Sequence, residues 1–398
     1  MNIIHFCITP MAGAPVRLVR ALNKYTSFNV NLVDLNRWGI YEHDLIFSED
    51  QEKVMELSEK ADIIHFHNYI DYNTKDFFPL DFKSLRDKGK FFIRQFHSSP
   101  DLISRKLNIS SESLHISSIP SLVIAQFQER YYPESLVVPN IIPQDSDLYQ
   151  RTGKHPLYGL FLNPTVIASA WSDRWNTKGL PETLLELRKA VKATGSNIKC
   201  VSNISHNNTL KLMDRSEIVI NDLVTGSYHL SGLEGLSLSK PVINFLDDRV
   251  QYVLRQISGA SSIPFINARL EDTRDIAIYL LRNKNDAVEI GSEGRKWIDK
   301  YWQDKKLVSH YINVYNTLVN DPCKIKRQRS LSLENKHIHF HSIILPDKIY
   351  ESRKFRYGFF KKNIIKLLSI LLKKYIRYFP FSLIRNIFFN NNNPDKNP

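Results

Sequence analysis

Short apolar runs alternate with amphipathic stretches along the first 323 residues. In the first half, runs with the length of buried strands occupy residues 2–8, 29–34, 62–67, 90–96 and 121–125. Stretches with helical spacing lie between them at 15–25, 52–59 and 76–88. In the first of these, Val16, Val19 and Leu22 share one face, and Pro15 suits the first helical turn. This alternation predicts an α/β fold built on a parallel sheet.

The second half repeats the scheme. Strands are predicted at 165–170, 198–201, 217–221, 241–246 and 263–267. Helices are predicted at 181–194, 208–215, 229–239, 249–257, 271–283, 286–301 and 304–319. A polar stretch at 144–155 separates the halves. We therefore expect an α/β domain over 1–145, a second over 156–303, a closing helix over 304–323 and a tail over 324–398. Two facing sheets of this kind create one cleft, because ligands bind beyond the carboxyl ends of the strands.

The net charge of +13 changes the picture, because all of it lies in the tail. Residues 324–398 contain 17 basic and 4 acidic residues, which leaves 37 of each sign in residues 1–323. The three cysteines are too few for a disulfide framework or a zinc site and fit a reducing compartment. The sequence has no run of about 18 uncharged apolar residues, so it predicts no conventional membrane-spanning helix.

The tail has the spacing of a basic amphipathic helix over 361–379, followed by the aromatic stretch 381–389. Ile364, Leu367 and Leu371 share its apolar face, and Lys366 and Lys373 lie away from that face. This pattern is typical of a helix that lies in an anionic membrane surface. Nucleic-acid binding or packing on the body are the alternatives. Because the apolar face is continuous, we expect residues 361–389 to bind the membrane and not nucleic acid, which predicts a cytoplasmic protein held peripherally at the inner face of the cell membrane.

Polar residues follow three strands of the first half. Gly13 lies in a loop of small residues after the first strand, where either an ordinary turn or an anion site would fit. His67 and Asn68 end the third strand, and His97 ends the fourth. A lone histidine is usually structural, but two on neighbouring strands favour a functional edge, and His97 most of all.

The strongest local pattern runs from Thr225 to Ile243, as a glycine-containing loop, a helix and a strand that begins at Pro241. The helix N-terminus can hold a diphosphate. Glu234, one to two turns into the helix, can accept both hydroxyls of a ribose, or can simply complement the helix dipole.

This stretch, Ser231-Gly-Leu-Glu-Gly-Leu-Ser-Leu-Ser-Lys-Pro-Val-Ile243, resembles the nucleotide-binding signature of retaining GT-B glycosyltransferases of the family 4 (group 1) type, as found in bacterial envelope-polysaccharide synthesis. Four more segments resemble motifs of that family in the same order, and these are 62–68, 96–99, 131–140 and 176–180. The resemblance covers about residues 1–320. It implies two Rossmann-like domains, the first for the acceptor and the second for a nucleotide-sugar.

The resemblance also implies residue roles. Glu234 would bind the ribose, and Lys178 would neutralise the donor diphosphate without a metal or other cofactor. His97 would contact the sugar or stabilise the departing charge. The remaining candidates are Gly226, Ser227, Tyr228, His229, Ser231, Asp222 and Gly13 on the donor side, and His67 and Asn68 on the acceptor side.

Two positions depart from the family pattern. Gly226 stands where a second Glu is common, and Ser172 where an Arg is common, although Arg174 could replace it. We expect a metal-independent, retaining hexosyltransferase that moves a sugar from a nucleotide-sugar to a lipid-linked or polysaccharide acceptor. The alternatives are an inactive nucleotide-sugar-binding or scaffold subunit, and an epimerase of the same fold.

Overall fold

The structure is a computed structural model, which describes residues 1–325 apart from 111–112, 115–117, 127–130, 133 and 164–179. Its N-terminal sheet has seven parallel strands in the order β3-β2-β1-β4-β5-β6-β7. These strands are β1 (Asn2–Cys7), β2 (Asn29–Asp34), β3 (Leu45–Ile46), β4 (Ile63–His67), β5 (Phe91–Phe96), β6 (Ser121–Ile124) and β7 (Leu136–Val138). Because every pairing is parallel, the carboxyl ends of all seven strands meet at one edge.

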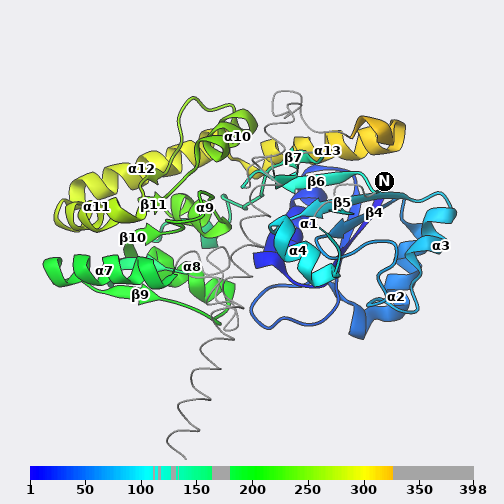
Figure 1. The fold of residues 1–398 in the computed structure, drawn as a ribbon, viewed down its shortest axis with the longest axis horizontal. Helices are drawn as coiled ribbons and strands as arrows, with labels where there is room; N and C mark the ends of the chain where they lie inside the picture. Colours follow the sequence, from blue (N-terminus) through cyan, green and yellow to red (C-terminus); the bar gives the residue numbers. More distant parts are fainter. Residues whose placement is uncertain (111–112, 115–117, 127–130, 133, 164–179, 326–398) are drawn as a thin grey trace, which may run out of the picture. The chain divides into compact units, whose positions relative to one another are not determined.

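The second sheet has five parallel strands in the order β12-β11-β10-β8-β9. They are β8 (Tyr158–Leu162), β9 (Ile198–Cys200), β10 (Ser216–Ile220), β11 (Val242–Asn244) and β12 (Ile266–Asn267). Helices connect the strands of both sheets, as Figure 1 shows. They are α1 (Ala14–Tyr25), α2 (Phe47–Lys60), α3 (Phe82–Asp87), α4 (Pro100–Leu107), α7 (Leu180–Thr194), α8 (His206–Asp214), α9 (Leu230–Ser237), α10 (Asp248–Ser258), α11 (Leu270–Arg282), α12 (Lys284–Tyr301) and α13 (Asp304–Asn320). The predicted α/β architecture with parallel sheets is confirmed.

The two faces of the N-terminal sheet differ in chemistry. On one face, Ile4 and Phe6 of β1 belong to an apolar cluster with residues of α2 and α3. Side chains alternate along a strand, so Ile3, His5 and Cys7 point to the opposite face. There Ile3 and Cys7 pack with residues of α1 and α13. Three buried histidines therefore share this second face, because β4 places His65 and His67 beside His5.

Helix α13 is the last described helix, and it returns to the N-terminal sheet. Tyr315 donates to or accepts from His5 and His65 through its hydroxyl. Near the start of the helix, Asp304 accepts a hydrogen bond from Tyr25 of α1 at 2.8 Å. The helix thus follows the second sheet in sequence but completes the core of the first.

The structure corrects several predicted elements. Strand β8 at Tyr158–Leu162 was not predicted, and the strand expected at 165–170 lies entirely outside the described residues. The helix expected at 76–88 is limited to Phe82–Asp87, because Asp81 caps it by accepting from the backbone N–H groups of Lys83 and Ser84. Strand β3 and helix α4 were not predicted. Both are short, and β3 has only two residues.

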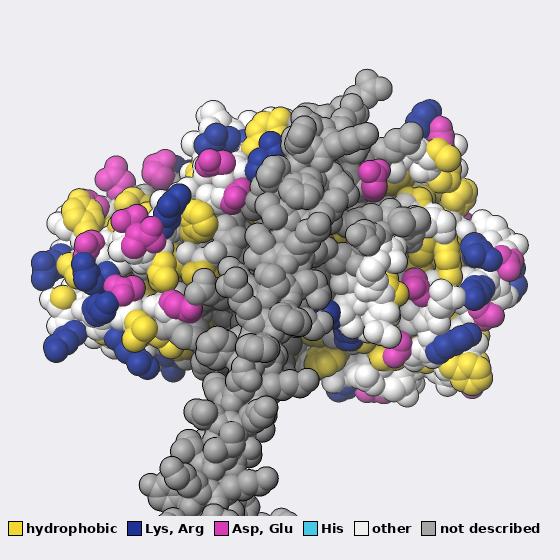
Figure 2. All heavy atoms as spheres, in the orientation of Figure 1, with side chains coloured by type: hydrophobic (Ala, Val, Ile, Leu, Met, Phe, Trp, Pro, Cys, Tyr) yellow, Lys and Arg dark blue, Asp and Glu magenta, His cyan; other side chains and the backbone are white. Residues whose placement is uncertain are grey.

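Charges of both signs are mixed on the visible described surface, in agreement with the zero net charge of residues 1–323 (Figure 2). Within the described ranges, no helix is both long and apolar enough to cross a bilayer. The predicted amphipathic helix at 361–379 and the rest of the tail beyond residue 325 lie outside the described residues.

Helix α9, which carries Glu234, is held in place by a close approach of α12. A side chain at Gly291 would meet the backbone oxygen of Ser239 at 2.2 Å and Pro241 at 3.1 Å. We predict that Gly291→Ala lowers the free energy of unfolding by ~2 kcal/mol, because this backbone contact cannot relax easily. Ser292→Ala, at the exposed neighbouring position, is the matched control and should change it by less than ~0.5 kcal/mol. Urea unfolding measures both, and equal stabilities would contradict this packing.

Candidate functional site

The candidate residues gather at the carboxyl ends of the strands in both sheets. His67 and Asn68 follow β4, His97 follows β5, and Asp222 follows β10. Contacts between residues from the two halves connect these ends. Ser227 donates a hydrogen bond to the backbone oxygen of Gln126, which lies just after β6. The fold therefore brings the predicted donor-side loop against the carboxyl edge of the N-terminal sheet.

Glu234 is the buried charge of this region. It lies in the second turn of α9, and its side chain is only 4% exposed. Its Oε1 lies 2.8 Å from Nε2 of His206 and 3.1 Å from Nη2 of Arg17. A buried carboxylate needs such partners, because its charge has lost the solvation of water. Glu234 is therefore more than a residue that complements the helix dipole.

Arg17 reaches Glu234 from α1, in the other half of the chain. Its Nη2 also donates to the backbone oxygen of Ala12 at 2.7 Å. Its Nη1 is buried and has no hydrogen-bond partner among the described residues. A guanidinium with one nitrogen in use and one available can bind a further oxygen of a ligand.

A pocket of about 170 Å³ lies beside this ion pair. Gly13, Arg17, Tyr41, Tyr149 and His206 contribute to its wall. Gly13 has a φ of +75°, and a side chain there would meet the Arg17 guanidinium and the Tyr41 ring at 3.3 Å. Glycine at this position thus leaves room for the two side chains that line the pocket. Burial raises the pKa of both tyrosines, so they face the pocket as neutral hydroxyls.

Sequence reasoning missed Arg17 and His206. Arg17 follows Val16 on α1, but the spacing of that helix drew attention only to its aliphatic residues. No sequence pattern singled out His206, which begins α8. A basic residue in the first turns of a helix that follows a small-residue loop was the available signal for Arg17.

The loop 225–229 has the backbone that its glycine requires. Gly226 has a φ of +79°, and a side chain would meet the Cβ of Asp247 at 2.9 Å. A Glu at this position would therefore be strained, which explains physically why the expected second acid is absent. Asp247, just before α10, closes the loop by donating its backbone N–H to the oxygen of Gly226.

Asp222 and His229 form a pair beneath this loop. His229 Nε2 lies 2.9 Å from Asp222 Oδ2, and His229 Nδ1 lies 3.4 Å from the amide nitrogen of Gln126. Asn140 donates to the amide oxygen of Gln126, so the nitrogen of that amide points to His229. Burial alone would raise the pKa of Asp222, but hydrogen bonds from His229 and Thr225 lower it. The carboxylate thus fixes His229 at the N-terminus of α9.

Three other predicted donor residues have structural partners. Tyr228 is fully buried and stacks on Phe265. Ser231 donates to Asn221 at 3.0 Å, and Ser227 is the residue that bonds to Gln126. These side chains shape the loop and the start of α9, and their contact with a donor stays a prediction.

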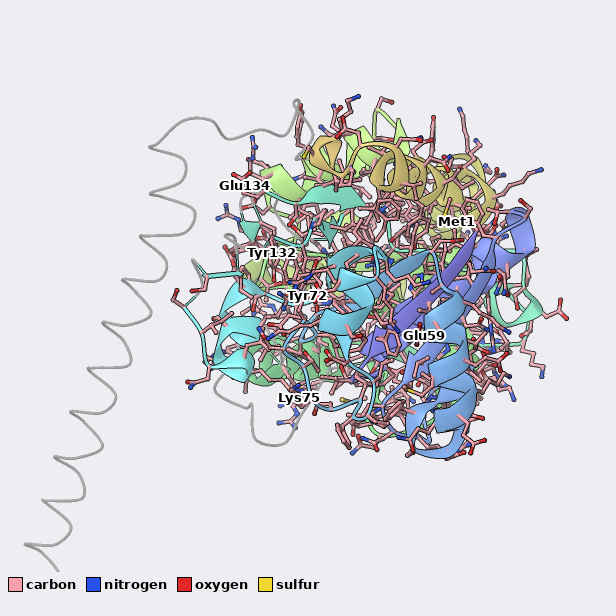
Figure 3. All side chains as sticks on the ribbon, turned by 90° about the vertical axis from the view of Figure 1, so that its right-hand side faces the viewer. Met1, Glu59, Tyr72, Lys75, Tyr132 and Glu134 are labelled. Atoms are coloured by element: carbon pink, nitrogen blue, oxygen red, sulfur yellow. The ribbon has the colours of Figure 1, made fainter. Side chains whose placement is uncertain are left out.

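The exit of β5 is held rigidly. The backbone N–H of His97 donates to the side chain of Asn68, and Asn68 donates to Ser98 at 2.9 Å. Tyr132, labelled in Figure 3, stacks on Phe96 with ring centroids 4.4 Å apart and donates to the backbone oxygen of Ser98. Asn68 therefore positions His97 in this structure. The predicted contact of Asn68 with an acceptor stays a prediction.

Solved structures share this architecture. HepE from Anabaena, in complex with UDP and glucose, matches with a TM-score of 0.52 and 12% identity over 80% of this chain and 100% of that chain. A glycosyltransferase from Rickettsia africae matches with a TM-score of 0.50 and 13% identity, over 80% and 98% of the two chains. An alpha-glucosyltransferase in complex with UDP and a DNA 13-mer matches with a TM-score of 0.50 and 11% identity, over 79% and 99%. No family model and no curated protein matches the sequence.

The chain has the GT-B fold. This confirms the predicted fold of two Rossmann-like sheets. Open parallel α/β sheets in general bind ligands beyond the carboxyl ends of their strands, and Glu234 and His97 both follow such strand ends here. Lys178 and Arg174, predicted to neutralise a diphosphate, lie outside the described residues, as does Ser172.

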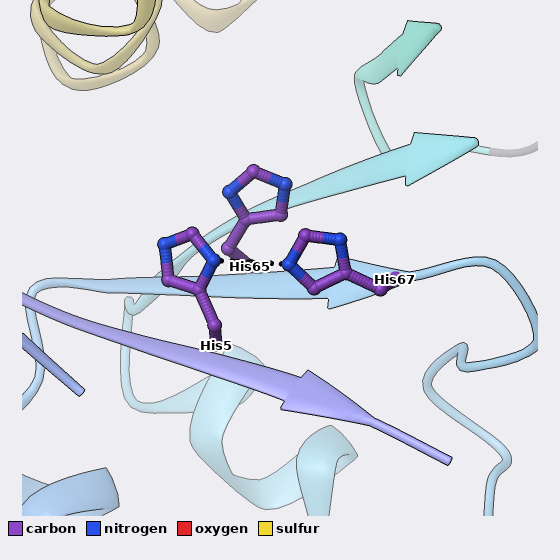
Figure 4. Close-up of side chains that lie close together, drawn as sticks. All are labelled: His5, His65 and His67. Atoms are coloured by element: carbon purple, nitrogen blue, oxygen red, sulfur yellow. Dashed lines mark hydrogen bonds between the residues drawn. The ribbon is translucent and has the colours of Figure 1, made fainter. Parts of the chain in front are cut away.

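His5, His65 and His67 are the one group of possible metal ligands found in the described residues, and Figure 4 shows them together. Their geometry favours hydrogen bonding. The rings of His65 and His67 stack at 13°, so their lone pairs lie in nearly parallel planes and do not converge on one ion. His5 Nδ1 and His67 Nε2 are already hydrogen-bonded at 3.0 Å.

The three buried histidines and the partly buried His97 make the stability of the fold dependent on pH. Burial lowers the pKa of His5 and of His97 to about 3, and it lowers the pKa of His65 and of His67 well below the ordinary value. The unfolded chain binds protons near pH 6.5, whereas the folded chain does not, so stability is complete above pH 6.5 and falls below it. We predict a loss of up to ~1.4 kcal/mol per pH unit for each histidine between pH 6.5 and 5.

Urea unfolding at several pH values measures this slope. His5→Gln should make the slope shallower, whereas His155→Gln, which changes an exposed histidine, should leave it unchanged. A slope that is the same for His5→Gln and the unaltered protein would contradict the neutral, buried state of His5.

Proposed function

We propose that this protein is a glycosyltransferase that uses a nucleotide-sugar donor, with a uridine diphosphate sugar as the first candidate. The observation that carries the proposal is the buried Glu234, held at the carboxyl edge of the second sheet behind a glycine loop. The GT-B fold and the UDP complexes of the similar HepE and alpha-glucosyltransferase structures support it.

In this proposal, Glu234 exchanges its hydrogen-bond partners when a nucleotide binds. Its Oε1 accepts from Arg17 and His206, and ribose hydroxyls are donors of the same kind. Arg17 would then be released toward the ligand, where its cationic guanidinium suits a phosphate or sugar oxygen. The contact between Arg17 and Glu234 would thus couple donor binding to Arg17, the residue that joins the two halves of the site.

The reaction we propose proceeds with retention and without a metal. Lys178 and Arg174 would neutralise the diphosphate as it leaves, and the leaving phosphate would take the proton of the acceptor hydroxyl. Catalysis would then rest on positioning and on stabilising the charge of the leaving group. The loop 226–229 and the N-terminus of α9 would hold the phosphates.

Glu234→Gln tests the donor site. The amide cannot accept from both a ribose and its cationic neighbours as a carboxylate does, so we predict at least a ~10-fold weaker affinity for UDP, equal to ~1.4 kcal/mol. Glu293→Gln, in an exposed i,i+3 pair with Lys296, is the control and should bind normally. Calorimetric titration of the full chain with UDP, with and without EDTA, measures the effect. Unchanged affinity in Glu234→Gln would refute the assignment.

A nucleotide-sugar-binding subunit without turnover is the second candidate. The observation that favours it is Gly226, whose backbone and surroundings exclude the acid that the family commonly has there. Hydrolysis of UDP-glucose without acceptor distinguishes the two functions. Binding with no hydrolysis and no transfer would favour the binding subunit.

The acceptor we propose is lipid-linked or a polysaccharide, at the inner face of the cell membrane. This rests on the basic amphipathic pattern of residues 361–389. Each basic residue near an anionic surface contributes ~1 kcal/mol, so several suffice for reversible attachment.

Flotation with liposomes tests the attachment. We predict that the full chain floats with vesicles containing anionic lipid and that a chain lacking residues 351–398 does not. Vesicles of neutral lipid are the control and should bind the full chain weakly. Equal flotation of both chains would remove the membrane role of the tail.

A further inference from the structure

A continuous chain of hydrogen bonds runs from His97 into the core of the N-terminal half. His97 Nε2 lies 2.8 Å from His67 Nδ1, and His67 Nε2 lies 3.0 Å from His5 Nδ1. His5 Nε2 lies 3.1 Å from the hydroxyl of Tyr315, which lies 2.8 Å from His65 Nδ1. The chain thus joins the exit of β5 to strands β1 and β4 and to helix α13.

Each imidazole in this chain is neutral near pH 7, because burial lowers the pKa of all four histidines. A neutral imidazole has one N–H donor and one acceptor nitrogen. Since each ring uses its nitrogens in series, fixing the proton on one ring fixes it on the next. The hydrogen bonds of the whole series can therefore be donated in only two ways, all in one direction or all in the opposite direction.

A backbone carbonyl selects the direction. The oxygen of Pro139 can only accept, so the Tyr311 hydroxyl donates to it at 2.8 Å. The hydroxyl oxygen of Tyr311 then accepts from the amide nitrogen of Gln95 at 3.2 Å. This fixes the orientation of the Gln95 amide and leaves its oxygen as a buried acceptor.

Gln95 passes this constraint to His65. Gln95 Oε1 and His65 Nε2 are both buried, and neither has a hydrogen bond of normal geometry to another described atom. A side-chain interaction with Gln95 favours protonation of His65. The arrangement in which His65 Nε2 carries the proton pairs a donor with an acceptor, whereas the opposite arrangement buries two acceptors without a donor.

We propose that this chain of hydrogen bonds from His97 to His65, here called the relay, holds His97 as a single tautomer, with the proton on Nε2 and a lone pair on Nδ1. His97 donates to His67, His67 to His5, His5 to Tyr315, and Tyr315 to His65. His97 is partly exposed, and its Nδ1 has no hydrogen bond to a described residue. It therefore presents an acceptor, which suits a ligand hydroxyl and not a negatively charged oxygen.

The inference rests on the proposed function in one respect only, the identity of the ligand that donates to His97, which would be a sugar hydroxyl. Of the two roles that the sequence suggested for His97, it favours contact with the sugar over stabilisation of the departing charge. Tyr315, His5 and His67 are then positioning residues that act through His97. Tyr315 belongs to α13, so the closing helix determines the chemistry of a residue at the site.

Nitrogen NMR of the full chain with ¹⁵N-labelled histidine tests the tautomer without any substrate. We expect the His97 signal, assigned with a His97→Gln variant, to show Nε2 protonated and Nδ1 unprotonated at pH 7.5. Tyr315→Phe removes the hydroxyl that links His5 to His65, so His97 should lose its single tautomer and give averaged nitrogen shifts. Tyr25→Phe, which removes another hydroxyl that bonds to α13, is the control and should leave the His97 signal unchanged.

Three results would overturn the proposal. They are a proton on Nδ1 of His97 in the unaltered protein, an unchanged His97 signal in Tyr315→Phe, and a stoichiometric metal ion in the purified protein that His5→Gln removes. None depends on donor binding or turnover. Loss of the relay and failure of the glycosyltransferase proposal are therefore separate outcomes.

Discussion

The buried contact between Arg17 and Glu234 is the interaction on which the candidate site depends. Two opposite charges from different halves of the chain lie 3.1 Å apart with little exposure to water. In such a place a charge is tolerated only with a partner, and removing either residue takes an oppositely charged partner away from the other. Arg17 also lines a pocket together with His206, and His206 in turn contacts Glu234. Groups that hold this region together therefore also form the wall of a cavity.

The polar interior of the N-terminal half follows the same logic. Its sheet has an apolar face under α2 and α3, and a second face where His5, His65 and His67 replace aliphatic side chains. These rings avoid the cost of burial because they bond to one another and to Tyr315. A chain of neutral donors and acceptors has a direction, and a carbonyl at its far end can set the state of a side chain at the surface.

Much of the fold could be predicted from sequence. Strand and helix periods depend on neighbouring residues, so most strands and helices were placed within a few residues, including α9 with Glu234. The errors have local causes. Strand β8 was not predicted, because Tyr158–Leu162 is short and follows a polar stretch. The Gly-rich signature found the loop at 226, but only the backbone angle there explains why a second acid is missing.

The sequence by itself determined the class of fold, the charge of the tail and the positions of Glu234, Asp222, His229 and His97 at strand or helix ends, because these follow from periodicity and spacing along one chain. The tertiary structure alone decided the partners. Arg17 meets Glu234 across more than two hundred positions, and Tyr315 meets His5 across 310. Such contacts depend on how separate elements pack, and no local pattern encodes which buried donor will face which buried acceptor.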